Sequence, residues 1–252
     1  MITRDNLLAY LDKTLTPSQI KDYCPNGLQV EGAESITKIV TGVTASQALV
    51  DAAVKAGADA LLVHHGYFWK GENQTITSLK RNRIKALLDA DINLIAYHLP
   101  LDIHPQLGNN AQLAKLFSIE NMRGLEAGNP VSVAVQGELS QTQTVAQLAQ
   151  TIEQQLGRKP SVEGDAGKEL KTVAWCSGGG QNYIELAGEL GIDAFISGEV
   201  SEQTVHLARE YDIAFFSVSH HASERYGVKA LGEHLSNELG LDVEFIDIDN
   251  WA

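Results

Sequence analysis

One pattern occurs twice in this chain: an apolar strand, a helix, a glycine and a second apolar strand. In the first half it runs from residues 38–43 to residues 60–63, with Gly57-Ala58-Asp59-Ala60 before the second strand. In the second half, Gly191-Ile192-Asp193-Ala194 stands at the corresponding point after residues 170–175. Strand, helix and strand in this order form a βαβ unit with parallel strands. The sequence predicts an α/β fold of two related halves with mixed, largely parallel sheets.

The repeat also sets the expected domains. We expect a first α/β half over residues 1–126 and a second over residues 127–252, with the C-terminal part packing back on the first half. The second half should contain an extra segment, a strand at 131–135 and a helix at 144–156. Of the 252 residues, 44% are hydrophobic and 20% are charged. These are ordinary globular proportions, so a core can form without disulfides.

Composition narrows the location and the partners. The N-terminal segment is too charged for a signal peptide, and no apolar run approaches the ~18 residues of a membrane span. The two cysteines, Cys24 and Cys176, match no paired metal or redox spacing and fit a reducing compartment. We therefore expect a cytoplasmic protein without a membrane partner. A net charge of −13 makes nucleic acid an unlikely partner, while a local pocket for a small anionic substrate stays open.

Five of the eight histidines directly follow apolar segments that are expected to be strands. They are His64 and His65 after residues 61–63, His98 after 94–97, and His220 and His221 after 213–219. In open parallel α/β sheets, ligands bind beyond the carboxyl ends of the strands. Three strand ends are therefore expected to deliver imidazoles to one edge, where the metal site would lie between the two halves.

Two carboxylates follow these histidines at equal spacing. Asp102 lies four residues after His98, and Glu224 lies four residues after His220. Leu99-Pro100 is expected to force an extended backbone, so that Asp102 reaches the site from a loop and not from a helix. Imidazoles and carboxylates without a thiolate suit Zn, Mn, Fe(II), Co or Ni. Two-metal hydrolytic sites commonly share a bridging carboxylate and a water between such ions.

The ordinary interpretation of a single histidine after a strand is a surface or cap residue. We interpret His104, His206 and His234 in that way. Adjacent residues of a strand point to opposite faces, so His64 and His65 can share a site only where the strand gives way to a turn, which Gly66 permits. Two His-His pairs and two His-x-x-x-acid segments in related places favour metal binding over coincidence.

At these residues the sequence resembles the type 2 GTP cyclohydrolase I-like family, also called the NIF-three-like family, and especially its short bacterial members of the YbgI type. The resemblance covers essentially the whole chain. It rests on the segments Asn26-Gly27-Leu28-Gln29-Val30-Glu31-Gly32, Val63-His64-His65-Gly66, Tyr97-His98-Leu99-Pro100-Leu101-Asp102, Ser197-Gly198-Glu199-Val200 and Ser219-His220-His221-Ala222-Ser223-Glu224-Arg225.

The resemblance implies two divalent metal ions per chain. Its ligand set maps to His64, His65, Asp102, His220 and Glu224. Glu224 would bridge the ions, Asp102 and one of the paired histidines would bind the first, and the other paired histidine and His220 would bind the second. His98 would stand beside the metals, as a residue that orients a ligand or transfers a proton. The resemblance also implies a ring-shaped homohexamer with the sites facing its interior.

One departure from the family pattern is visible, since Ser219 replaces the usual glycine before the last ligand histidine. Other segments carry weaker predictions. The run 177–180 (Ser-Gly-Gly-Gly) reads as a turn more than as a phosphate cradle, because the lysine of a P-loop is missing. The aromatic run 67–69 fits substrate stacking, packing or subunit contact. Asn26 and Gln29 fit a pocket or a turn, and Glu199 fits a place near the metals or a solvated charge.

Three functional hypotheses follow. The first is a metal-dependent hydrolase, with the family label suggesting cyclohydrolase action on GTP or a related purine nucleotide and His98 moving a proton. The second is a non-catalytic ring that binds metal or ligand and regulates a partner. The third is redox chemistry, if the ions are iron. Metal-dependent turnover separates the first from the second, and oxygen dependence separates the third.

Overall fold

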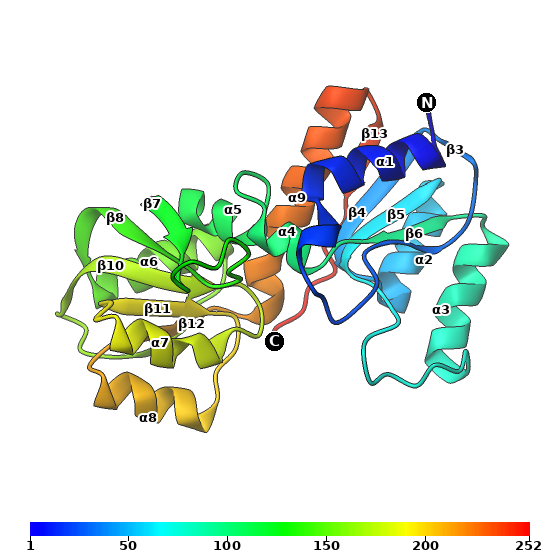
Figure 1. The fold of residues 1–252 in the computed structure, drawn as a ribbon. Helices are drawn as coiled ribbons and strands as arrows, with labels where there is room; N and C mark the ends of the chain where they lie inside the picture. The colour runs from blue at the N-terminus through cyan, green and yellow to red at the C-terminus, as the bar shows by residue number, and fades with distance from the viewer. The chain divides into compact units, whose positions relative to one another are not determined.

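The computed structural model describes residues 1–252, which form two compact units. Unit 1 comprises Met1–Gly108 and Gly227–Ile248, and unit 2 comprises Asn109–Tyr226 and Asp249–Ala252. Each unit has its own sheet and its own core (Figure 1). The expected domains, residues 1–126 and 127–252, stay a prediction.

Unit 1 is built on a five-stranded sheet in the order β13-β4-β5-β6-β2. The first four of these strands run parallel, and β2 pairs antiparallel with β6. A short antiparallel pair, β1-β3, stands apart from the sheet. The strands are β1 Ile2–Thr3, β2 Gly27–Val30, β3 Ser35–Ile36, β4 Lys38–Thr44, β5 Ala60–His65, β6 Asn93–Ala96 and β13 Asp242–Phe245.

Helices cover both faces of the unit 1 sheet (Figure 1). One face packs α1 and the later turns of α9, and the other packs α2 and α3. Along β5, Ala60 and Leu62 belong to the first core, whereas Leu61 and Val63 belong to the second. A strand buried on both faces reads as a continuous apolar run, which is why residues 60–63 are all apolar. The helices are α1 Arg4–Leu15, α2 Gln47–Ala56, α3 Ser78–Asp89, α4 Leu99–Ile103 and the 3-10 turn η1 Pro17–Gln19.

Two helix starts in unit 1 show how local sequence sets the bounds. The Ser46 hydroxyl accepts a hydrogen bond from the Leu49 N–H and begins α2, and Gly57 ends this helix in the left-handed conformation with φ +67°. The first helix, α1, begins at Arg4. Thr3 caps it by accepting a bond from the Asn6 N–H, and Asp5 lies inside the first turn. An acidic residue there is favourable at the positive end of the helix dipole.

Unit 2 is built on a six-stranded sheet in the order β7-β8-β10-β11-β12-β9. The central strands β10, β11 and β12 run parallel, and the outer strands join antiparallel. The strands are β7 Ile119–Gly124, β8 Val135–Thr144, β9 Ser161–Glu163, β10 Glu169–Cys176, β11 Ala194–Ser197 and β12 Ala214–Ser217. Together with the sheet of unit 1, this confirms the predicted α/β class with mixed, largely parallel sheets.

Helices also cover both faces of the unit 2 sheet. One core contains α5 and α6, and the other contains α7 and α8. Along β10, Val173 and Trp175 enter the first core, and Ala174 and Cys176 enter the second. The helices are α5 Asn109–Leu116, α6 Val145–Leu156, the 3-10 turn η2 Gln181–Tyr183, α7 Ile184–Glu189 and α8 Glu202–Glu210. Helix α9, His220–Leu239, begins in unit 2, and its turns from Gly227 onward belong to unit 1.

The strand expected at residues 131–135 is wrong. The strand β8 begins at Val135, and residues 131–134 form a loop after Pro130. The Ser132 hydroxyl donates to the Ala134 carbonyl and accepts from the Glu126 N–H. Such side-chain bonds to the local backbone compete with strand pairing. The helix expected at 144–156 is confirmed, with Thr144 as its cap and Val145 as its first residue.

The predicted repeat is visible in equivalent hydrogen bonds. The Asp59 carboxylate accepts bonds of 2.7 and 2.9 Å from the N–H groups of Thr37 and Lys38, where β4 starts. The Asp193 carboxylate accepts bonds of 3.0 and 2.8 Å from the N–H groups of Lys171 and Thr172 in β10. The preceding glycines both adopt left-handed φ angles, +67° and +68°. Each Gly-x-Asp-Ala segment therefore ends a helix and ties the next strand to its parallel neighbour.

The Asp193 bonds carry a stability prediction. The Thr172 hydroxyl adds a third bond to the same carboxylate oxygen, at 2.8 Å. Because bonds to a charged group contribute about 1.5–3 kcal/mol, we expect Asp193→Ala to lower the free energy of unfolding by about 2–4 kcal/mol at pH 7. Denaturant unfolding measures the difference, with Glu185→Ala on the exposed side of α7 as a control that should change little.

The Asp193 carboxyl also makes the stability of the fold depend on pH. Partial burial raises the pKa of Asp193, but the bonds from Thr172 and Lys171 and the charge of Lys168 outweigh it, so that the pKa lies below its usual value. A depressed pKa in the folded state stabilises the fold above the unfolded-state pKa, and this contribution is lost as the pH falls through the folded-state pKa. The difference in unfolding free energy between the parent and Asp193→Ala should therefore become smaller below about pH 4. A gap that stays constant or widens on acidification contradicts this role.

None of the helices is long and apolar enough to cross a membrane.

Candidate metal centre

His64 and His65 lie at the carboxyl end of β5, within the strand itself. The His64 side chain is fully buried, at 0% exposure. Its Nδ1 lies 3.1 Å from the Tyr97 carbonyl oxygen, to which it donates. The Nδ1 of His65 lies 3.1 Å from Thr44 Oγ1 in the neighbouring strand β4. Since Nδ1 is engaged in both rings, Nε2 is the nitrogen that each ring presents to a metal.

His98 follows β6 and stands at the start of α4. Its Nδ1 lies 2.7 Å from Asp22 Oδ1, and its backbone N–H donates to Asn26 Oδ1 at 2.8 Å. The other Asp22 oxygen accepts from Asn26 Nδ2 at 2.9 Å and from the Leu99 N–H at 3.0 Å. Burial raises the pKa of the Asp22 carboxyl, but the bond to His98 and the other donors lower it more, so that it is ionised at neutral pH. Asp22 therefore fixes both the His98 ring and the start of α4.

Asp102 lies in a helix, and the expected loop is wrong. Residues Leu99–Ile103 form α4, with Pro100 in the first turn. Proline is tolerated in the first turn because the N–H it lacks would have no partner inside the helix. The residue before the proline, Leu99, is thus the first residue of the helix. Asp102 is buried, and its Oδ1 lies 3.5 Å from His64 Nε2.

The three histidines of unit 1 form one cluster. Their ring centroids lie 4.6 Å apart for His64 and His65, 5.1 Å for His64 and His98, and 5.6 Å for His65 and His98. One ligand nitrogen from each lies within 4.8 Å of the other two. Trp69 closes one side, with its ring 4.9 Å from that of His98 and 5.8 Å from that of His65. The cluster offers imidazole donors of the kind that divalent transition metals bind.

A second group, Asp22, Cys24 and His98, also has ligand atoms within 4.8 Å. Asp22 is occupied by donors to both of its oxygens, including the His98 ring and the Leu99 N–H. Burial and the charge of Asp22 raise the pKa of the Cys24 thiol to about 12, which disfavours the thiolate that metals bind. This group therefore serves to hold His98 and does not suit a metal.

In unit 2, His220 and Glu224 share the first turn of α9. They are four residues apart on one helix face, and His220 Nε2 lies 3.2 Å from Glu224 Oε2. The Glu224 side chain is almost fully buried. Glu199, which follows β11, accepts from His220 Nδ1 at 2.7 Å. Burial lowers the pKa of His220, but Glu224 and then Glu199 outweigh it and raise the pKa to about 9. The two carboxylates thus stabilise the positive charge of a protonated His220 ring. A bound metal ion can supply that positive charge instead of the proton.

The glycine run after β10 lies against these two side chains. A Cβ at Gly178 would lie 2.1 Å from Glu224 Oε1 and 3.0 Å from His220 Nε2, and this residue adopts φ +61°. The Gly178 N–H donates to Ser223 Oγ at 2.9 Å. The run therefore makes room for the His220–Glu224 pair, a role that goes beyond the turn expected from sequence.

The strand register revises one part of the repeat. Ala60 pairs with Asn93 in unit 1, and Ala194 pairs with Ala214 in unit 2. Counting on from these pairs makes Ser219, and not His220, the counterpart of His98. Ser219 adopts φ +77°, in the left-handed region that favours glycine. Its hydroxyl accepts from the Ala222 N–H at 3.2 Å and so helps to begin α9.

The other segments singled out from the sequence have structural roles. The Tyr67 hydroxyl donates to the Ala45 carbonyl, and its ring is buried. Gln29 Oε1 accepts from the Tyr67 N–H and so fixes the chain after the histidine pair. Trp69 alone of the aromatic run 67–69 contacts the histidines. The sequence does not predict the bond between Asp22 and His98. Of the two alternatives for Glu199, its contact with the His220 ring favours a place near the predicted ligands.

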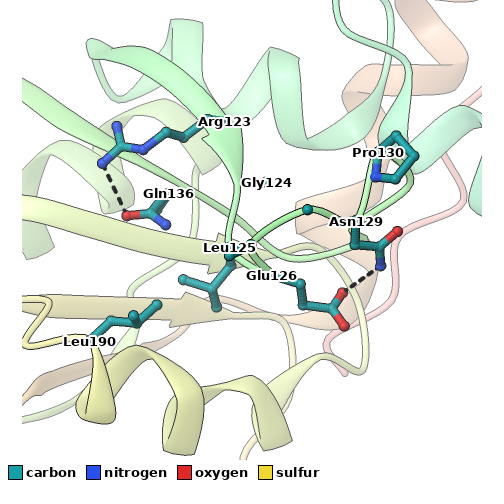
Figure 2. A pocket seen from close by; sticks show the side chains of 10 residues that line it. Arg123, Gly124, Leu125, Glu126, Asn129, Pro130, Gln136 and Leu190 are labelled. Atoms are coloured by element: carbon teal, nitrogen blue, oxygen red, sulfur yellow. Dashed lines mark hydrogen bonds between the residues drawn. The ribbon is translucent and has the colours of Figure 1, made fainter.

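Unit 2 also contains a pocket of about 510 Å³ that the residues of the candidate metal centre do not line (Figure 2). Its polar side chains bond to one another, Arg123 to Gln136 at 3.2 Å and Asn129 to Glu126 at 3.1 Å. Leu190 completes its apolar side. No histidine and none of the predicted metal ligands lines it, so it is separate from the metal chemistry.

Comparison with known families decides the relationship. The family model described as Duf34/NIF3 (NGG1p interacting factor 3) matches residues 2–251. The chain belongs to the Duf34/NIF3 family. A protein of Haemophilus influenzae named GTP cyclohydrolase 1 type 2 homolog is 59% identical over 243 residues, with 96% of each chain covered. A protein of Escherichia coli K12 with the same name is 56% identical over 243 residues, again with 96% of each covered. The resemblance expected from the sequence motifs is confirmed.

Solved structures of the Duf34/NIF3 fold match over the full length. A structure titled protein ybgI, of unknown function, is 53% identical with a TM-score of 0.95, and both chains are covered completely. A structure from Thermus thermophilus is 32% identical with a TM-score of 0.89, also with complete coverage of both chains. Reduced HcgD from Methanocaldococcus jannaschii, at 24% identity and a TM-score of 0.84 with 98% of each chain covered, shares the fold.

Proposed function

We propose that this Duf34/NIF3 protein binds two divalent metal ions through His64, His65, Asp102, His220 and Glu224. Glu224 bridges the ions, Asp102 and one of His64 and His65 bind the first, and the other histidine and His220 bind the second. One observation carries the proposal. Each of the three ligand histidines engages its Nδ1 with an oxygen, from Tyr97, Thr44 and Glu199 respectively. Hydrogen bonds of this kind orient metal-binding histidines in proteins.

The donor chemistry fits divalent transition metals. Three imidazoles and two carboxylates without a thiolate suit Zn, Fe, Mn, Co or Ni. Asp102 and Glu224 are buried at 6% and 2% exposure, and a buried carboxylate needs a counter-charge to be stable. The glycine at position 178 leaves room beside Glu224 that a side chain would fill. These features support a bound metal more than they support a solvated acidic surface.

We propose that the chain uses this centre as a hydrolase. Bound ions of this kind lower the pKa of water and polarise the group under attack. The chain's own residues hold the donors in place, and Trp69 covers the histidine cluster on one side. The names of the relatives suggest a GTP-like purine nucleotide as substrate. We further propose a cytoplasmic ring-shaped homohexamer, as the family resemblance implies.

Turnover by the metal-loaded chain tests the hydrolase proposal. The chain, loaded in turn with Zn²⁺, Mn²⁺, Co²⁺, Ni²⁺ and anaerobic Fe²⁺, is incubated with GTP and a panel of purine nucleotides, and the products are separated by chromatography. We expect product with at least one metal and at least a ~100-fold lower rate for Asp102→Asn. The non-catalytic ring predicts binding without product for any metal. Turnover that needs both iron and oxygen supports the redox alternative.

A further inference from the structure

We infer that Trp69 recognises the substrate by stacking on its purine base beside the metal centre. The inference rests on the proposed function, because Trp69 lies next to the proposed ligands. It goes further in naming the part of the substrate that the chain recognises and the residue that recognises it. It leaves the five-ligand set as proposed.

Trp69 is a large apolar side chain that belongs to no core. Tyr67 and Phe68, the two residues before it, pack in the core that unit 1 shares with α2 and α3. Trp69 is only partly buried, and it belongs to none of the four cores of the molecule. Core packing therefore explains two aromatic residues of the run 67–69 and leaves the third for another role.

The ring contacts of Trp69 are with two histidines of the candidate metal centre. Its centroid lies 4.9 Å from that of His98 at an interplanar angle of 83°, and 5.8 Å from that of His65 at 59°. The two imidazole centroids lie only 5.6 Å from each other, so both stand on the same side of the indole. The rest of the indole carries no other aromatic ring. A base stacked on it would lie next to the proposed ligands.

Hydrogen bonds hold Trp69 in place before any ligand binds. The indole Nε1–H donates to the Gly66 carbonyl at 3.2 Å. The Trp69 backbone N–H donates to Glu72 Oε2 at 3.0 Å, and the Glu72 N–H donates back to the Trp69 carbonyl at 2.9 Å. Lys80 pairs with the other oxygen of Glu72 at 3.0 Å. A group that is already ordered loses less entropy on binding, so a fixed indole suits ligand recognition.

The occupied indole N–H determines what Trp69 can recognise. With Nε1 bonded to Gly66, the ring has no donor left for a ligand and offers only its π surface. Stacking on an aromatic side chain is tolerant of base identity, because every base has a π face. Trp69 should therefore favour a nucleotide over its sugar phosphate and should not distinguish guanine from adenine.

Two ligands that differ only in the base test the inference. The Zn²⁺-loaded chain is titrated in a calorimeter with guanosine 5′-monophosphate (GMP) and with ribose 5-phosphate. We expect GMP to bind at least ~10-fold more tightly than ribose 5-phosphate. Trp69→Leu should weaken GMP binding by about 10–100-fold and leave ribose 5-phosphate binding unchanged. Trp69→Phe, which keeps a smaller aromatic ring, should fall between the parent and Trp69→Leu.

Three controls accompany this titration. Trp251→Leu makes the same substitution at a side chain of unit 2 that is 84% exposed, and its GMP affinity should equal that of the parent. Adenosine 5′-monophosphate (AMP) should lose the same factor in affinity as GMP in Trp69→Leu. GMP should quench part of the tryptophan fluorescence of the parent, and Trp69→Phe should remove that quenching.

Several results overturn the inference. In the first, Trp69→Leu folds, as judged by circular dichroism, and binds GMP as tightly as the parent. In the second, it loses as much affinity for ribose 5-phosphate as for GMP. A loss for GMP without a loss for AMP also overturns the inference, because an indole without a free N–H cannot tell the two bases apart. A changed oligomeric state with unchanged GMP affinity assigns Trp69 to a subunit contact instead. If Trp69→Leu does not fold, the affinity and quenching of Trp69→Phe decide.

Failure of this inference is distinguishable from failure of the proposed function. A parent chain that binds two Zn²⁺ ions and hydrolyses a nucleotide, with a Trp69→Leu variant that binds GMP equally well, refutes only the stacking role. A parent chain that binds no Zn²⁺ yet prefers GMP to ribose 5-phosphate through Trp69 refutes the metal centre and keeps the stacking role.

Discussion

Replacing Glu224 by glutamine is expected to weaken binding of both metal ions by at least ~100-fold, because the substitution removes the shared negative ligand while keeping the side-chain shape. Glu224 is buried at 2% exposure and faces His220 Nε2 at 3.2 Å. The glutamine amide carries no negative charge. The repulsion between two cations bound at this residue is therefore no longer offset. Zn²⁺ titration against a competing chelator measures the loss.

The control for this variant is Glu233→Gln, an exposed glutamate on the same helix. It removes the same charge from α9 without touching the ligands, and its Zn²⁺ affinity should equal that of the parent. If Glu224→Gln keeps both ions at parental affinity, the bridging role is wrong.

Gly178→Ala should have the second largest effect, and it should reduce metal binding more than it reduces stability. The added Cβ would lie 2.1 Å from Glu224 Oε1, at the end of a side chain that can swing aside. The clash is therefore expected to move the carboxylate away from its ligand position and to cost about 100-fold in Zn²⁺ affinity. The left-handed φ of +61° adds a backbone cost of about 1–2 kcal/mol.

A matched variant separates these two contributions. Gly191 adopts φ +68° in the same unit, with nothing within 4 Å of an added Cβ. Gly191→Ala should therefore show the same loss of unfolding free energy from the backbone and no loss of Zn²⁺ affinity. Equal Zn²⁺ affinities for Gly178→Ala and Gly191→Ala would show that the glycine is needed only for its backbone conformation.

The parts of the fold that sequence predicts well are those decided by neighbouring residues. The βαβ order follows from local apolar runs, and Gly57 and Gly191 end their helices because glycine adopts left-handed angles without strain. The Gly-x-Asp-Ala repeat was visible for the same reason. The carboxylates of Asp59 and Asp193 then bond to strands about 20 residues away, which the repeat implied only through its position.

Other parts depend on context that a local pattern does not contain. Leu99-Pro100 is expected to be extended, yet these two residues begin α4, because the Leu99 N–H is satisfied by Asp22 from 77 residues away. The pairing of β13 with β4 joins residues about 200 positions apart, and no local alternation of apolar and polar residues predicts it. The sequence left Glu199 open between a place near the metals and a solvated charge, and only the structure places its carboxylate 2.7 Å from His220 Nδ1.

The candidate site follows the same division. The five predicted ligands could be chosen from motifs, since His-His and His-x-x-x-acid segments are local features. The residues that orient the rings, Asp22 and Thr44 among them, could not be chosen, because an aspartate or threonine in a loop or strand carries no sign of a distant histidine. The resemblance places His98 beside the metals, and the structure shows that Asp22 holds its ring at Nδ1.

The most direct test of the metal centre is elemental analysis of the purified parent chain, after reconstitution with Zn²⁺ and removal of loosely bound ions. The proposed site predicts about two metal ions per chain. A parent chain that holds no stoichiometric metal after reconstitution would contradict the dinuclear centre and, with it, the hydrolase proposed from it.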